Sequence, residues 1–376
     1  MANHDTKSNF VDISSGNQIK KVYKKKGRAK RILCGFLSVV LLICGSGMVY
    51  YYSLLNSLNY KDLGDQSGDN TDATIATIPE LESSYADGEL LQNSKVLNVM
   101  LFGEDNNKGS AYGRSDTMIM LSIDNIHKKL KMTSFQRDTY VYIPGYGYNK
   151  INASYTYGGP ALSIQTIEAN FGIKIDRYAV VDFNSFKQII DTLGGVDMEL
   201  TQNEIDYINY QMYKNGQSDE WSTIKDSPGI VHLDGQEALW YARNRGLSVG
   251  EDGNEIGIDG DDWSRTSKQR KLLETIFESM KDASLTQIVS IVSSIGPLVT
   301  TNFKKDEITA LVGNALTYLQ YDIEQYYVPE TGYWAYNDNT SAGSVIEITD
   351  MEGQRLAFAE FVYEELVSGS STTTTQ

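Results

Sequence analysis

Short runs of apolar residues alternate with polar breaks through the middle of the chain. Residues 96–103, 117–124 and 129–135 are rich in Val, Ile, Leu and Met and have the length of strands. The polar segment 124–128 between the second and third runs predicts a hairpin connection. Residues 178–183 and 196–200 predict two further strands. These runs predict a sheet as the centre of the fold.

Helical spacing appears between and after these strands. Residues 160–171 carry apolar side chains at three- and four-residue intervals behind a proline, which a first helical turn tolerates. A second helix is predicted at 184–193, and Asp234 followed by Glu237 predicts a capped helix start. Further helices are predicted at 263–282, 285–295, 306–319 and 351–366. Such alternation predicts an α/β fold with a mixed central sheet flanked by helices, an α/β/α sandwich.

The first sixty residues follow a different pattern. Residues 1–31 contain nine Lys or Arg and two Asp, a net charge of +7, and an uncharged stretch follows to residue 60. About 20 apolar residues suffice to cross a bilayer as a helix. We therefore predict one transmembrane helix at 32–55, with a basic cytoplasmic arm before it and the rest of the chain outside. The bulky tyrosines that end the apolar run favour a retained signal-anchor over a cleaved signal peptide.

The outer part of the chain divides into three segments. Residues 56–93 are rich in Asp, Ser, Gly and Thr without a sustained period, which predicts an acidic flexible stalk. The Ser- and Thr-rich residues 368–376 predict a disordered tail. No convincing linker interrupts residues 94–367, so one extracytoplasmic domain is expected there, with its core at about 94–283.

Charge narrows the range of partners. The chain has 33 Lys and Arg against 49 Asp and Glu, which gives a net charge of −16. Because residues 1–31 carry +7, residues 32–376 carry −23. A body this acidic is repelled by a phosphate backbone, and no nucleic acid is expected as partner. The basic arm instead suits anionic membrane lipid. Both cysteines lie in the predicted transmembrane helix, which excludes a disulfide inside the outer domain.

The candidates for chemistry are acids and arginines at the ends of predicted strands and helices. No Walker loop and no His-Glu-x-x-His helix occurs, and His127 and His232 lie beside expected turns, as surface histidines do. If the first three strands are neighbours, Asp105, Asp116 and Arg137 gather at one edge of the sheet. The same class of residue recurs later in the chain at Arg243, Arg245, Asp262 and Arg265.

This set of side chains suits a diphosphate bound with a divalent ion. Carboxylates are hard oxygen ligands for Mg²⁺ or Mn²⁺, and Mg²⁺ usually takes one or two of them together with substrate phosphates. Guanidinium groups match phosphate oxygens in pairs. Each of these residues taken alone is better explained by a surface ion pair, so the interpretation depends on their meeting in one place.

The motifs that carry these residues resemble the LytR-CpsA-Psr family. The resemblance covers about residues 93–283 and includes several motifs in the family's order. They are Asn-Val-Met-Leu-Phe-Gly-Glu-Asp at 98–105, Gly-Arg-Ser-Asp-Thr-Met at 113–118, Ser-Phe-Gln-Arg-Asp-Thr-Tyr-Val at 134–141, Lys-Ile-Asn-Ala-Ser-Tyr at 150–155, Asp-Thr-Leu-Gly-Gly-Val-Asp at 191–197, Ala-Leu-Trp-Tyr-Ala-Arg-Asn-Arg at 238–245 and Asp-Trp-Ser-Arg at 262–265.

The resemblance implies a membrane-anchored phosphotransferase that organises the cell wall. Such an enzyme moves a glycopolymer, a teichoic acid or capsular polysaccharide, from an undecaprenyl-diphosphate carrier to peptidoglycan. It implies Asp105 and Asp116 as ligands of Mg²⁺ or Mn²⁺. The residues implied to bind the diphosphate are Arg114, Arg137, Arg243, Arg245, Arg265 and Gln269. Arg137 is also implied in catalysis, and the base that activates the acceptor hydroxyl is Asp116 or Asp262.

Several alternatives remain open at this stage. The same residues suit a lipid-pyrophosphate hydrolase that uses water as acceptor, and older family names describe transcriptional attenuators. Asn107 stands where the family often has arginine. The glycine-rich acidic segment 246–260 is expected to be a mobile flap. The lipid needs an apolar tunnel, which the helices around Phe171, Phe186 and Ile189–Ile190 could line, although core packing is the better explanation of these residues.

Overall fold

The computed structural model describes residues 59–61, 90–105, 112–219, 223–225, 227–249, 255–258 and 261–364. All of them belong to one compact unit, Ser57–Gln376. The predicted arm, transmembrane helix and tail lie outside the described residues, as does most of the predicted stalk. Within the described ranges, no helix is both long and apolar enough to cross a membrane.

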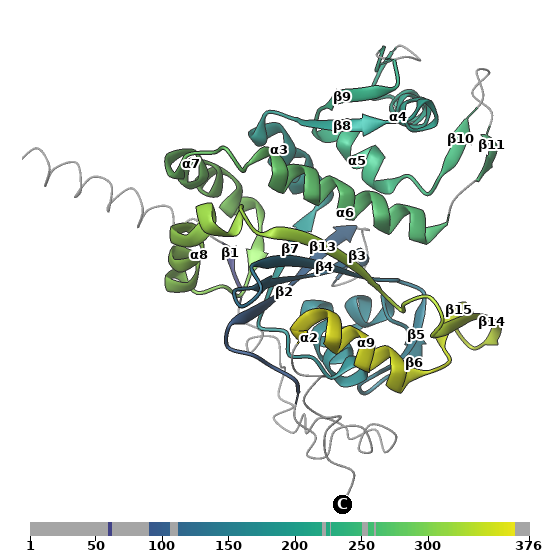
Figure 1. Ribbon diagram of the computed structural model, residues 1–376. Coiled ribbons are helices and arrows are strands. Elements are labelled where there is room, and N and C mark those ends of the chain that lie inside the picture. The colour runs from purple at the N-terminus through teal and green to yellow at the C-terminus, as the bar shows by residue number, and fades with distance from the viewer. Residues whose placement is uncertain are drawn as a thin grey trace, which may run out of the picture. The chain divides into compact units, whose positions relative to one another are not determined.

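A mixed sheet forms the centre of this unit (Figure 1). Its order is β1-β12-β7-β2-β3-β4-β13. These strands are β1 (Asn59–Tyr60), β12 (Thr300–Thr301), β7 (Arg177–Asp182), β2 (Val96–Asp105), β3 (Arg114–Asp124), β4 (Lys129–Phe135) and β13 (Asp322–Val328). The strands β2, β3 and β4 are antiparallel neighbours, whereas β7 joins β2 and β13 joins β4 in parallel. The predicted mixed sheet and the hairpin at 124–128 are confirmed.

Helices lie on both faces of the sheet (Figure 1). Because strand residues alternate in direction, Met100 and Phe102 pack on one face against α2 (Ala153–Phe171) and α9 (Met351–Tyr363). On the other face, Ile123 packs with apolar residues of α6 (Asp262–Ser279) and α8 (Lys305–Tyr318). The mixed α/β fold predicted from the sequence is confirmed.

A buried polar contact joins the first long strand to the last helix. The Asn98 side chain in β2 donates to the Tyr363 hydroxyl of α9 at 3.0 Å, across 265 residues of sequence. The Ser122 hydroxyl of β3 donates to the side-chain oxygen Oδ1 of Asn98 at 2.7 Å. Since buried amides need hydrogen-bond partners, these contacts fix α9 in one position against the sheet.

A second core stands on the other side of α6. It is built from α3 (Phe183–Leu193), β8 (Val196–Leu200), α4 (Gln202–Lys214), β9 (Gly229–Leu233) and α5 (Gly235–Arg243), with Leu272 of α6 packed into it. The predicted cap of α5 is confirmed as a capping box between Asp234 and Glu237. Next to it, a Cβ on Gly235 would lie 2.2 Å from the Lys187 carbonyl oxygen, so the glycine permits α5 to pack directly on α3.

Several elements do not follow from local sequence pattern. A smaller sheet has the order β14-β15-β5-β6, in which β15 pairs with β5 in parallel across about 200 residues of sequence. The strands of this sheet are β14 (Trp334–Thr340), β15 (Gly343–Ile348), β5 (Thr139–Ile143) and β6 (Gly147–Lys150). Outside it, α7 (Leu285–Ile295), which the sequence predicted, is followed by the 3₁₀ turn η2 (Gly296–Leu298).

Three predicted segments differ from expectation. Strand β1 lies within the segment predicted as stalk and pairs with β12. In the segment predicted as a mobile flap, β10 (Leu247–Val249) and β11 (Glu255–Ile258) pair as an antiparallel ribbon that the sequence did not predict. The string Gly-Leu-Ser-Val-Gly at 246–250 enters this ribbon and lacks the strand–turn–helix setting of a nucleophile elbow. Helix α2 starts seven residues before Pro160 and bends at Gly158 and Gly159.

Candidate active site

Asp116 stands in a β-bulge at the start of β3. Gly103 of β2 pairs with Thr117 and Glu104 pairs with Ser115, so that Asp116 has no partner in the ladder. A bulge of this kind redirects a side chain out of the regular alternation, and bulges are common beside active sites. The Asp116 carboxylate is thereby directed toward the end of β4 and the start of α6, where arginines surround it.

Arg137 stands two residues past the end of β4 and bridges three carboxylates. Its Nη1 donates to Asp116 Oδ1 at 3.2 Å, and its Nε lies 3.2 Å from Asp262 Oδ1 and 3.3 Å from Asp138 Oδ2. The other Asp138 oxygen pairs with Lys150 at 2.8 Å. Asp138 was not among the predicted site residues, although its position next to Arg137 in the sequence was the available signal. Its contacts hold the Arg137 guanidinium in place.

The first turn of α6 forms the side of the site that faces Asp116 and Arg137. Asp261 caps the helix by accepting from the Trp263 and Ser264 amides, which orients the turn that follows. Arg265 Nη2 lies 2.8 Å from Asp262 Oδ1 and donates to the Asp116 carbonyl oxygen at 3.0 Å. The Arg265 side chain is only 4% exposed, so this contact is a buried ion pair and not a surface one.

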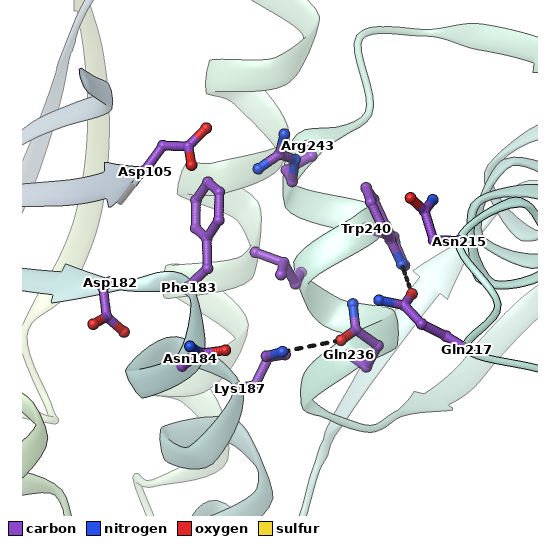
Figure 2. A pocket seen from close by; sticks show the side chains of 11 residues that line it. Asp105, Asp182, Phe183, Asn184, Lys187, Asn215, Gln217, Gln236, Trp240 and Arg243 are labelled. Carbon is purple, nitrogen blue, oxygen red and sulfur yellow. Dashed lines mark hydrogen bonds between the residues drawn. The ribbon is translucent and has the colours of Figure 1, made fainter. Parts of the chain in front are cut away.

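The two arginines at the end of α5 point to different places. Arg245 approaches Asp262 with 3.8 Å between Nε and Oδ1. Arg243 instead lies over the Phe183 ring, 4.5 Å from its centroid. There it lines a pocket of about 360 Å³ that also includes Asp105, and Figure 2 shows both side chains at the same end of this pocket.

The two partly buried carboxylates of the site, Asp116 and Asp262, differ in acidity. Burial alone raises the pKa of Asp116, but Arg265 and Arg137 outweigh it, and the net pKa is lowered. For Asp262, burial outweighs the same attraction, and the pKa is raised. Neither oxygen of Asp262 accepts a hydrogen bond from the described residues, since its arginine contacts are close but poorly aligned. A pair of carboxylates with opposite shifts is typical of sites that separate binding from base catalysis.

Asp105 and Asp116 fit the expected metal-binding role. They come from the adjoining ends of β2 and β3, and the Asp105 carboxylate makes no hydrogen bond or ion pair with the described residues. Asp116 retains oxygen lone pairs beside its arginines, and Mg²⁺ commonly takes only one or two protein carboxylates. The residues present are therefore compatible with a Mg²⁺ ion that shares its coordination with a phosphate.

Another group of possible metal ligands lies at the far end of β3. Asp124, His127 and Glu364 meet there, roughly 26 Å along the strand from Asp116. Lys131 is fully buried between them, 2.9 Å from Asp124 and 2.7 Å from Glu364, so a cation already balances these acids. The prediction of a surface histidine is wrong for His127, which is half-buried and bonded to Asp124 at 2.7 Å, while His232 is mostly exposed.

Two predicted diphosphate ligands lie at the margin of the site. Arg114 is exposed at the start of β3, opposite Asp105 in the ladder. Gln269 is buried and donates to the Ala242 carbonyl oxygen at 3.3 Å, which ties α6 to the end of α5. Gln269 thus supports the arginines of α5, and the structure does not bring it into contact with the carboxylates.

The structure therefore brings most of the sequence-predicted residues together. Ion pairs connect Asp116, Arg137, Arg245, Asp262 and Arg265 into one group, which we call the arginine cluster. Asp105 and Arg243 line the adjoining pocket. These seven side chains come from β2, β3, α5, α6 and the segments that follow β4 and α5. Their roles toward a substrate stay predictions.

Comparisons with known proteins identify the family of this chain. The family model LytR_cpsA_psr matches residues 58–354. A relative from Oceanobacillus iheyensis, named polyisoprenyl-teichoic acid--peptidoglycan teichoic acid transferase TagU, is 29% identical over 302 residues, which are 78% of this chain and 83% of the relative.

Solved structures share the fold. The crystal structure of B. subtilis TagV is 29% identical with a TM-score of 0.54 and covers 72% of this chain and 98% of its own. A structure of YwtF (TagT) with bound octaprenyl pyrophosphate lipid is 21% identical with a TM-score of 0.52, over 75% of this chain and 97% of its own. With the family model matched over more than half of its length, the chain belongs to the LytR_cpsA_psr family.

Proposed function

We propose that the protein transfers an anionic cell-wall glycopolymer, a teichoic acid or capsular polysaccharide, from a polyprenyl-diphosphate carrier to peptidoglycan. The observation that carries this proposal is the arginine cluster, in which three guanidinium groups surround two partly buried carboxylates at one edge of the sheet. Such a concentration of guanidinium groups suits a diphosphate, because each fork can bind two phosphate oxygens. The transferase name of the relative TagU points to the same reaction.

The lipid of the carrier requires an apolar surface beside the cluster. Leu101 of β2 and Ala179 and Val181 of β7 are only half-buried, although they lie on central strands of the sheet. Alternation along the strands turns these side chains away from the α2–α9 face, toward the side on which α3 contacts β2 and β7. Central strands under helices are normally fully covered, so this face offers apolar area to an isoprenoid chain.

The tunnel residues expected from the sequence separate into two groups. Phe171 belongs to the opposite face, where it is fully buried against Phe135 and Phe358, so the alternative of core packing holds for this residue. Ile190 is buried in the core around α3. Phe186 and Ile189 of α3 are half-buried and remain candidates for the lipid surface.

The reaction joins an acceptor oxygen to the phosphorus that carries the glycopolymer. The bond from that phosphorus to the bridging oxygen breaks, and polyprenyl phosphate leaves. Arg137, Arg245 and Arg265 stabilise the negative charge that accumulates on the leaving phosphate. Asp105 and Asp116 would hold Mg²⁺ or Mn²⁺, which when bound supplies further charge neutralisation to the diphosphate.

Asp262 is the proposed base for the acceptor hydroxyl. A sugar hydroxyl is a weak nucleophile, so proton removal in the transition state accelerates its attack. The raised pKa of Asp262, caused by burial, makes its carboxylate more basic than that of Asp116, whose pKa the arginines lower. Asp262 also has oxygens that accept no hydrogen bond from the described residues. Its role is to receive the hydroxyl proton while Arg137 and Arg265 hold it in position.

The location that suits this reaction is the outer face of the cell membrane. The proposal includes the single transmembrane helix at 32–55, the cytoplasmic arm at 1–31 and the catalytic domain outside. Carrier lipid and peptidoglycan meet on that side. Cysteines introduced at residues 15 and 220 test this topology through their reaction with a membrane-impermeant reagent added to intact cells. Labelling is expected at residue 220, and labelling at residue 15 would contradict the topology.

The test of the function is transfer by the purified full chain in detergent, with carrier-linked glycopolymer and peptidoglycan fragments. Arg137→Ala and Arg245→Ala are each expected to reduce transfer at least a hundredfold, because each removes one guanidinium from the phosphate. Arg177→Ala, which removes a partly exposed arginine paired with Glu307, serves as the matched control. Full activity of the double variant of the cluster would contradict the proposal. Release of free glycopolymer in the absence of peptidoglycan would indicate the hydrolase instead.

A further inference from the structure

A polar pocket adjoins the arginine cluster between the start of α3 and one face of α5 (Figure 2). Its volume of about 360 Å³ lies within the range of small-ligand sites. Asp105 and Arg243 join it to the proposed diphosphate site. Four of its lining side chains are primary amides, namely Asn184, Asn215, Gln217 and Gln236.

This polar lining favours binding of a sugar and disfavours binding of a lipid chain. A primary amide donates and accepts at once, as do sugar hydroxyls and N-acetyl groups. The rings of Phe183 and Trp240 add apolar faces of the kind that pack against a sugar ring. An isoprenoid chain in the same place would leave the amides without hydrogen-bond partners, which costs free energy at each of them.

The amides at the floor of the pocket are already oriented. Lys187 Nζ donates to Gln236 Oε1 at 3.2 Å, and Trp240 Nε1 donates to Gln217 Oε1 at 2.7 Å (Figure 2). Because these hydrogen bonds hold the Oε1 atoms of Gln236 and Gln217, the NH₂ group of each amide points away from its bonded partner. Gln236 Nε2 is buried and donates to none of the described residues. A buried donor without a partner is uncommon in folded proteins, and a ligand acceptor can satisfy this one once the Gln236 side chain turns into the pocket.

We infer that this pocket binds an N-acetylated sugar ring of the acceptor glycan and brings its hydroxyl to the diphosphate at the Asp105–Arg243 end. The inference rests on the proposed function. The carrier-linked polymer is already held through its lipid and diphosphate, whereas the acceptor has neither group and needs a binding surface of its own. Holding a weak nucleophile beside the phosphorus also removes much of the entropic barrier to its attack.

The probe is a disaccharide-tetrapeptide released from peptidoglycan, titrated calorimetrically into the full chain in detergent without carrier lipid. Gln236→Leu is expected to weaken its binding about tenfold and to leave the binding of sugar-free polyprenyl diphosphate unchanged. Gln202→Leu is the matched control, since Gln202 is exposed at the start of α4 and outside the pocket. Asn184→Leu, at an exposed position of the same lining, is the second variant if Gln236→Leu lowers the unfolding midpoint.

The outcomes separate the inference from the proposed function. Equal affinity of the pocket variants and the Gln202→Leu control for the disaccharide-tetrapeptide overturns the sugar pocket. If the pocket variants weaken binding of the glycopolymer-loaded carrier and leave the disaccharide-tetrapeptide unaffected, the sugar belongs to the donor and the acceptor assignment is wrong. A wild-type chain that binds the disaccharide-tetrapeptide but neither binds sugar-free polyprenyl diphosphate nor transfers polymer would refute the proposed function and leave the sugar pocket standing.

Discussion

Replacement of Arg265 by methionine tests how the arginine cluster is held together. The Arg265 and Asp262 side chains are 4% and 12% exposed, and their nearest atoms are 2.8 Å apart. Removing one partner of a buried pair leaves the other charge without compensation, which typically costs about 3–5 kcal/mol. We expect Arg265→Met to lower the free energy of unfolding by about this amount.

Two further variants make this expectation specific. Arg265→Met combined with Asp262→Leu removes both charges, and we expect it to recover about 1–3 kcal/mol relative to the sum of the single effects. Arg177→Met removes one partner of the Arg177–Glu307 pair, whose side chains are 26% and 30% exposed. Solvent weakens a pair of that kind, so the expected cost is at most about 1 kcal/mol.

Urea unfolding of the full chain in detergent, followed by tryptophan fluorescence, measures the wild type, these three variants and Asp262→Leu alone, which is needed for the sum of the single effects. Trp263 lies next to Asp262 and reports on the first turn of α6. The reasoning would be refuted if Arg265→Met cost no more than Arg177→Met. It would also be refuted if the double variant were as unstable as the sum of its single changes, because the pair would then not act as a unit.

Three more predictions follow from other contacts. Burial alone raises the pKa of Asp124, but hydrogen bonds from the His127 amide and Lys131 lower the pKa to about 2. The ionised Asp124 therefore contributes about 1–2 kcal/mol to the free energy of unfolding above pH 4, and this contribution is lost as the pH falls from 4 to 2. Asp124→Asn is expected to flatten this part of a curve of stability against pH, and an unchanged slope would contradict the expectation. Gly235→Ala is expected to lower the free energy of unfolding by about 1–3 kcal/mol, because the added Cβ would clash with the Lys187 carbonyl oxygen. An unchanged urea midpoint would show that α3 and α5 move apart without cost and would contradict this expectation. Asp105→Asn is expected to raise the Mg²⁺ concentration required for half-maximal transfer at least tenfold, and an unaltered metal titration would remove Asp105 from the metal site.

The sequence predicted the parts of the fold that local pattern determines. Runs of apolar residues located β2, β3 and β4, and the order of motifs identified Arg137 and Asp262 as members of one site. The pairing of β15 with β5 was not predictable, because it joins segments about 200 residues apart and depends on packing, not on local propensity. The ribbon β10–β11 was missed because its composition is that of a loop.

The site shows the same division between local and long-range information. The motif spacing correctly placed Asp116 at the edge of the sheet, but the bulge that redirects its side chain is a property of the pairing between β2 and β3. Arg243 and Arg245 are two residues apart and have the same charge, so their sequence gives no reason for their divergence. The Phe183 ring, which attracts Arg243 into the pocket, comes from a distant helix.

The contact between Asn98 and Tyr363 bears on how this chain reaches its folded state. The two partners are 265 residues apart, so the central sheet gains this covering helix only when the chain up to residue 363 is available. Contacts of such long sequence separation slow folding and extend the lifetime of open intermediates. Synthesis that stops before residue 363 would therefore leave a chain whose sheet has one apolar face open to aggregation and proteolysis.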